Sequence, residues 1–136
     1  MTAAGTTLER QSKRILVVDD DAAVREMLVR VLVDDGYAAS AVADGQAALR
    51  LDAASPLDLV LLDLGMPGDD GWEIFRRLTR QHPGLAVIII TAKPNQQPRA
   101  RQAGAGALFE KPLDFPELLE AVGHLLTVSP NFQKTS

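Results

Sequence analysis

Short apolar runs alternate along this chain with longer stretches in which apolar side chains recur at helical spacing. A continuous apolar run of four to six residues is typical of a strand buried on both faces, as in a parallel sheet. The pattern predicts five such strands, at residues 14–18, 37–42, 57–62, 86–90 and 107–110.

The stretches between these runs predict helices. The clearest covers residues 22–35, where Val24, Leu28 and Leu32 share one face and Gly36 follows as a stop signal. The other helices are expected over 45–53, over 72–81, near Pro98, and after Asp114, which is spaced from Glu117 as an N-cap from its N3 partner.

Strands that alternate with helices imply right-handed crossovers and an α/β fold, in which a doubly wound parallel sheet carries helices on both faces. The helix between Thr91 and Gly104 has little room. Pro94 and Pro98 restrict it further, because proline is tolerated only in the first turn of a helix. We therefore expect this fourth helix of the fold to be short or irregular.

Polar side chains follow the predicted strands at the ends where ligands bind to sheets of this kind. Asp19 and Asp20 follow the first strand, Asp63 the third and Thr91 the fourth, while Lys111 lies just past the fifth. Crowded carboxylates repel by about 4 kcal/mol per pair at roughly 4 Å and an effective dielectric near 20. Either a pKa rises or a cation binds among them. Hard oxygen ligands without His or Cys favour Mg²⁺.

A carboxylate is also a recognised covalent acceptor of phosphate, and a metal ion can neutralise the phosphoryl group as it arrives. In this interpretation Asp63 accepts the group, Lys111 pairs with one of its oxygens as a point charge, and the Thr91 hydroxyl binds another. Each residue alone has an ordinary alternative, such as a helix cap, a turn or a surface charge. The set at matching strand ends carries the prediction.

Composition narrows the classes of function. The 136 residues fit one domain. With 14 basic and 18 acidic residues, the net charge of −4 gives no support to direct nucleic-acid binding. The absence of cysteine excludes thiol chemistry and Cys-ligated metals. No stretch has the pattern of a signal peptide or the length of a membrane span, so we expect a cytoplasmic protein.

The strand-end residues lie in four stretches that together resemble the receiver domain of bacterial two-component response regulators. The resemblance covers about Lys13 to Leu126 and implies a flavodoxin-like sheet with strand order 2-1-3-4-5. The expected division is an N-terminal tail over 1–12, a receiver domain over 13–127 and a C-terminal tail over 128–136. The four stretches are ILVVDDD at 15–21, DLVLLDLGMPGDDGWE at 58–73, VIIITAK at 87–93 and FEKPL at 109–113.

The resemblance implies a role for each group at the strand ends. Asp63 would accept a phosphoryl group from a phosphohistidine on a sensor histidine kinase or a phosphotransfer protein. Mg²⁺ would be held by Asp19, Asp20 and Asp63 together with the backbone carbonyl of Gly65. Such a domain catalyses only its own phosphorylation and dephosphorylation, so it is not expected to be an enzyme with an external substrate.

Thr91 and Lys111 would then turn toward the phosphoryl group and change a surface that binds an output domain, a target protein or a second copy of the chain. Here the sequence departs from the family. Many receivers carry Tyr or Phe where this chain has Leu108, and strand alternation places Phe109 on the opposite face. Lys93, two residues past Thr91, could contact the phosphoryl group. The fourth helix usually belongs to the output face of the family, and because we expect it to be short here, we expect an unusual output surface or dimer arrangement.

Two alternatives stay open. A Mg²⁺-dependent phosphohydrolase would use an aspartate nucleophile after the first strand and an acid two residues later, which Asp19 and Asp21 match in spacing alone. A degenerate receiver would bind a partner without phosphorylation. His82 precedes Pro83 at a helix end and is expected to be solvated. The residues after Val128 are few, which suits a stand-alone receiver or a piece of a longer regulator.

Overall fold

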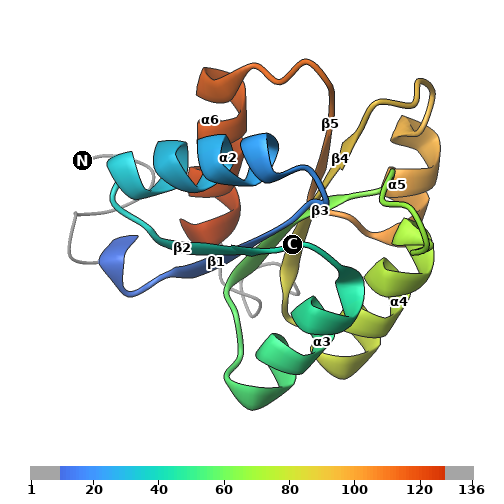
Figure 1. Ribbon diagram of the computed structural model, residues 1–136, viewed down its shortest axis with the longest axis horizontal. Helices are drawn as coiled ribbons and strands as arrows, with labels where there is room; N and C mark the ends of the chain where they lie inside the picture. Colours follow the sequence, from blue (N-terminus) through green and yellow to red (C-terminus); the bar gives the residue numbers. More distant parts are fainter. Residues whose placement is uncertain (1–9, 128–136) are drawn as a thin grey trace.

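A five-stranded parallel sheet lies between two layers of helices in the computed structural model, which describes residues 10–127 (Figure 1). The strand order is β2-β1-β3-β4-β5, which confirms the predicted doubly wound α/β fold. The boundaries differ from the predicted ones by at most two residues. The strands are β1 (Arg14–Val18), β2 (Ala38–Val42), β3 (Leu59–Asp63), β4 (Ala86–Thr91) and β5 (Ala107–Glu110).

Each face of the sheet has its own apolar core. One core joins α2 and α6 to side chains such as Ile15 and Leu61, and the other joins α3, α4 and α5 to their strand neighbours Leu16 and Leu62. Within residues 10–127, no helix combines the length and apolar character needed to cross a membrane. The helices are α2 (Ala22–Asp34), α3 (Gly45–Ala54), α4 (Gly71–Gln81), α5 (Gln97–Ala103) and α6 (Phe115–Thr127).

Aspartates fix where four of these helices begin. The side chains of Asp21, Asp44 and Asp70 accept hydrogen bonds from first-turn N–H groups of α2, α3 and α4. Asp114 accepts from the N–H of Glu117 at 3.0 Å, as the sequence predicted. An N-cap of this kind stabilises a helix by about 1 kcal/mol. The caps hold the loops at the carboxyl ends of the strands, where each of these helices starts.

α5 differs from the others and confirms the expectation of a short helix. It has seven residues, no side-chain cap at its start and Pro98 in its first turn. Contacts to other elements hold it instead. Gln97 Nε2 donates to the carbonyl of Leu108 in β5 at 3.3 Å. The Arg99 guanidinium lies 4.7 Å from the centre of the Trp72 ring in α4, and Trp72 Nε1 donates to Gln96 at 3.4 Å.

The predicted tails fall mostly outside the description, since residues 1–9 and 128–136 are not among those that the structure describes. Arg10 is described and packs against the body of the domain. Its Nη1 donates to the carbonyl of Asp35 at 2.8 Å and lies 3.1 Å from that residue's carboxylate, while the guanidinium stacks over Tyr37.

A buried carboxylate joins α3 to the end of α4. Asp52 is 3% exposed, and its oxygens lie within 3.0 Å of the Leu57 N–H, Gln81 Nε2 and His82 Nδ1. The expectation that His82 is merely solvated is therefore wrong. Burial alone would raise the pKa of the Asp52 carboxyl, but the hydrogen bonds from Leu57, His82 and Gln81 outweigh it and lower the pKa below 3.8.

This cluster predicts a pH-dependent effect of Asp52→Asn. A carboxyl with a lowered folded-state pKa adds stability above its unfolded value of 3.8, and that stability is lost as the pH falls through the folded-state value. The variant should lose about 2 kcal/mol at pH 7, because it removes hydrogen bonds to a charged group. Urea unfolding should show that the difference in free energy of unfolding between wild type and variant disappears only below pH 3.8. An equal loss at every pH would contradict the account.

Candidate functional site

The strand register brings the predicted site residues to one edge of the sheet. Val18 of β1 pairs with Leu62 of β3, so Asp19 and Asp63 follow side by side where the two strands end. The helices that follow β1 and β3 lie on opposite faces of the sheet (Figure 1). Ligands bind at such a switch point in open α/β sheets because the loops diverge there.

Three carboxylates meet at this point. Asp19, Asp20 and Asp63 each offer an oxygen within 4.8 Å of the others. Asp19 and Asp63 are 1% and 5% exposed, whereas Asp20 is exposed. The structure brings these three carboxylates together, and their role as metal ligands stays a prediction.

Burial is the main reason that the pKa of the Asp63 carboxyl lies above its ordinary value of 3.8. The neighbouring charge of Asp19 raises it further. The N–H of Gly65, which donates to Asp63 Oδ1 at 3.0 Å, and the charge of Lys111 act in the opposite direction. Asp63 is thus a carboxylate held in an unfavourable environment that a further positive charge would relieve.

Lys111 supplies one such charge. Its Nζ lies 3.2 Å from Asp19 Oδ2 and 3.7 Å from Asp63 Oδ2. Burial alone would lower the pKa of Lys111, but the charges of Asp63, Asp19 and Asp20 raise it above its ordinary value. One ammonium faces three carboxylates, so the cluster keeps an excess of negative charge.

The fourth strand contributes Thr91 next to this cluster. Asp63 pairs with Ile90, so Thr91 lies one residue beyond that pair, fully buried. Its Oγ1 accepts a hydrogen bond from the N–H of Lys93 at 2.9 Å, and its carbonyl accepts from the N–H of Lys111 at 2.8 Å. The hydroxyl proton of Thr91 is left to donate.

The residues predicted to relay a change lie where strand alternation placed them. Leu108 belongs to the core that contains α3, α4 and α5, and Phe109 packs against the opposite core. Phe109 therefore cannot take the place of an aromatic side chain at position 108. Lys93 is exposed, and its amino group has no hydrogen bond within residues 10–127.

Asp21 takes no part in the cluster. Its side chain accepts hydrogen bonds from the N–H groups of Ala23 and Val24 and caps α2. The phosphohydrolase alternative needed Asp21 as an acid beside Asp19. Because the Asp21 carboxylate caps α2, the phosphohydrolase alternative loses its second catalytic group.

Two contacts that support the site were not predicted from the sequence. Arg25 Nη1 donates to the backbone carbonyl of Asp19 at 2.9 Å, and Asp69 in the loop after β3 accepts from the N–H of Gly45 at 3.0 Å. No spacing rule marks a side chain that reaches a backbone group of another element. Asp52 did carry a signal, because it lies four residues after Ala48 on the apolar face of its helix.

The donor set suits a hard divalent cation. Carboxylate oxygens are the ligands that Mg²⁺ prefers, and a small octahedral ion can accept them directly or through its remaining waters. The raised pKa of Asp63 is the physical sign that such a charge would be stabilising here. The three carboxylates could therefore hold a metal ion.

Curated relatives match most of this chain in sequence. The response regulator MprA of Mycolicibacterium vanbaalenii is 42% identical over 115 residues, which cover 83% of this chain and 50% of that protein. MprA of Mycobacterium tuberculosis is 40% identical over 117 residues, which cover 85% of this chain and 51% of that protein. The chain thus spans about half the length of these relatives.

Solved structures agree with the fold. A response regulator receiver protein from Burkholderia phymatum has a TM-score of 0.76 at 34% identity, covering 88% of this chain and 99% of its own. A CheY-like receiver domain protein from Methanospirillum hungatei has a TM-score of 0.77 at 28% identity, covering 91% and 98%. A family model described as the response regulator receiver domain matches residues 15–123. The chain therefore belongs to the receiver domain family of two-component response regulators.

Proposed function

We propose that this receiver domain accepts a phosphoryl group on Asp63 from a phosphohistidine of a sensor histidine kinase or a phosphotransfer protein. The supporting observation is the environment of the Asp63 carboxylate, where Oδ1 is held by the Gly65 N–H and Oδ2 faces Lys111. Oδ2 would form the new bond to phosphorus. The nitrogen–phosphorus bond of the donor breaks, and the imidazole nitrogen keeps the electron pair.

Asp19, Asp20, Asp63 and the backbone carbonyl of Gly65 would hold Mg²⁺ for this step. The bound ion supplies positive charge that offsets the carboxylates and the phosphoryl oxygens. The Gly65 N–H keeps the Asp63 carboxylate in a fixed orientation. Lys111, which already lies between Asp19 and Asp63, would pair with one phosphoryl oxygen.

A phosphoryl group carries nearly two negative charges, replaces the single charge of the Asp63 carboxylate and places them further out from the strand, and this is the change that the rest of the domain would sense. The hydroxyl of Thr91 can donate to a phosphoryl oxygen by turning away from the N–H of Lys93. That movement would loosen the loop between Thr91 and α5, with Lys93 free to approach the new charge. Phosphorylation would in this way shift the equilibrium between two conformations of the loop that leads from Thr91 to α5.

The surface formed by α5, β5 and α6 would carry the response to an output domain, a target protein or a second copy of the chain. Its arrangement differs from an aromatic switch, because Leu108 fills that position and α5 is tied to Trp72 and β5. No external substrate is turned over in this proposal. In this proposal the domain acts in the cytoplasm, where it meets the phosphohistidine of its donor.

The first test is covalent. Incubation with Mg²⁺ and acetyl phosphate should give a single phosphate adduct by intact mass spectrometry, and Asp63→Asn should give none. Asp58→Asn is the matched control, since Asp58 lies just before the other end of β3 and its carboxylate accepts a hydrogen bond from the N–H of Arg14, away from the acidic cluster. Steady turnover of varied phosphate esters would support a phosphohydrolase instead, and no adduct with any donor would support a degenerate receiver.

Asp63→Asn should also stabilise the metal-free domain. A carboxyl whose folded-state pKa is raised opposes folding above that value, and the penalty disappears below 3.8, where both states are protonated. We therefore expect the free energy of unfolding of the variant to exceed that of the wild type at pH 7, with the difference shrinking as the pH falls toward 3.8. Thermal unfolding should show Mg²⁺ stabilising the wild type more than the variant. A variant less stable than wild type without Mg²⁺ would refute this.

Thr91→Val should separate phosphorylation from the response. Valine keeps the shape of the buried side chain and removes only the hydroxyl. Trp72 is the one tryptophan of the chain. It contacts Gln96 just before α5 and Arg99 within α5, so its fluorescence reports on that helix. Phosphorylation should change the fluorescence of wild type and of the control Thr127→Val, while Thr91→Val forms the adduct with little change. An undiminished change would remove Thr91 from the relay.

A further inference from the structure

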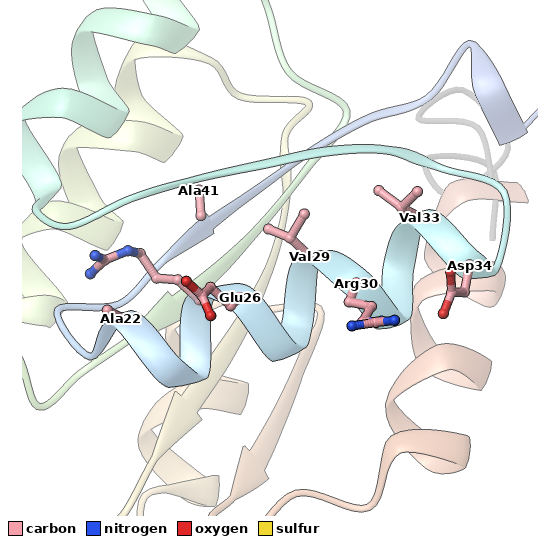
Figure 2. Close-up of a pocket in the computed structure, with 8 residues that line it drawn as sticks. Ala22, Glu26, Val29, Arg30, Val33, Asp34 and Ala41 are labelled. Atoms are coloured by element: carbon pink, nitrogen blue, oxygen red, sulfur yellow. The ribbon is translucent and has the colours of Figure 1, made fainter.

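The first turns of α2 carry a side chain that reaches back to the acidic loop. Arg25 lies four residues after the N-cap of α2, and its Nη1 donates to the backbone carbonyl of Asp19 at 2.9 Å. The same side chain lines a groove of about 630 Å³ between α2 and β2. Figure 2 shows this groove, with Val29 and Val33 pointing from α2 toward the strand that carries Ala41.

Asp19 is held from several directions. Its N–H donates to the carbonyl of Val42 at 3.2 Å, which extends the pairing of β1 with β2. One carboxylate oxygen accepts from the N–H of Asp21 at 2.9 Å, and the other faces Lys111. The bond from Arg25 fixes the remaining group of this residue, its carbonyl.

Asp20 has far less support. It is exposed, and among residues 10–127 its carboxylate has no hydrogen-bond partner. Because the peptide group is planar, a bond that fixes the carbonyl of Asp19 also fixes the plane that leads into Asp20. The contact that Arg25 makes therefore restrains the backbone at the point where Asp20 joins the other two carboxylates.

We propose that Arg25 is a positioning residue for the divalent cation, which sets how tightly the acidic loop binds Mg²⁺ without touching the ion. The inference rests on the proposed function for the identity of the cation. Two effects of Arg25 have opposite signs. Its positive charge alone weakens binding of a cation nearby, whereas its hold on the loop strengthens binding by keeping Asp20 in place. Loss of Arg25 thus distinguishes a positioning role from a simple charge effect.

The test measures Mg²⁺ binding directly, by titrating ¹⁵N-labelled protein and following the backbone amide shifts of the acidic loop. Arg25→Met should raise the dissociation constant about tenfold, the usual scale for losing a group that orients metal ligands. Arg25→Lys retains one hydrogen-bonding group, so its Mg²⁺ dissociation constant should lie between those of Arg25→Met and wild type. Arg30→Met is the matched control, because Arg30 is exposed on the same helix, lines the same groove and carries the same charge. It should bind Mg²⁺ as tightly as wild type.

A second readout separates positioning from damage to the acceptor. At saturating Mg²⁺, Arg25→Met should form the acetyl phosphate adduct at the wild-type rate. The variant should differ from wild type only in needing a higher Mg²⁺ concentration to reach that rate. Unchanged or tighter Mg²⁺ binding in Arg25→Met overturns the inference, as does an equal loss in Arg30→Met. The proposed function fails separately, if wild type binds Mg²⁺ and forms no adduct. If Arg25→Met does not fold, the ranking of Arg25→Lys against wild type decides.

Discussion

The repulsion among Asp19, Asp20 and Asp63 is the constraint around which this domain is built. Three carboxylate oxygens within 4.8 Å of one another oppose folding unless positive charge is supplied. The parallel sheet imposes the crowding, because β1 and β3 end side by side, and Lys111 relieves only part of it. The cluster could therefore hold a cation, and its crowding carries a cost in stability that the two apolar cores offset.

The response of the fold to this site depends on how the fourth strand and α5 are connected. Thr91 is fully buried and bonded to the backbone of Lys93, and α5 begins only six residues after Thr91. A helix this short has little cohesion of its own, so its position follows its contacts with Trp72 and β5. A change at Thr91 can then reach the α5 surface through backbone, without an aromatic side chain at position 108.

The sequence predicted the sheet and the acidic cluster well, because both follow from local rules. Continuous apolar runs mark buried strands, and the carboxyl ends of such strands share one edge, so Asp19, Asp63 and Thr91 could be grouped although they lie far apart in the chain. The contacts of His82 with Asp52 and of Arg25 with the Asp19 carbonyl could not be predicted. They join a side chain to a distant helix or to a backbone oxygen. The place of Asp52 on the apolar face of its helix indicated that it is buried but did not identify His82 as its partner.

The most direct measurement locates the covalent bond. Borohydride reduces an acyl phosphate to the alcohol and leaves free carboxylates and phosphate esters intact, so the phosphorylated aspartate becomes homoserine. Peptide mass spectrometry of the reduced protein should find homoserine at position 63 alone, in a yield that requires Mg²⁺ during phosphorylation. Homoserine at position 19 or 20, or phosphate retained on a serine, threonine or histidine, would contradict the assignment of Asp63 as the acceptor.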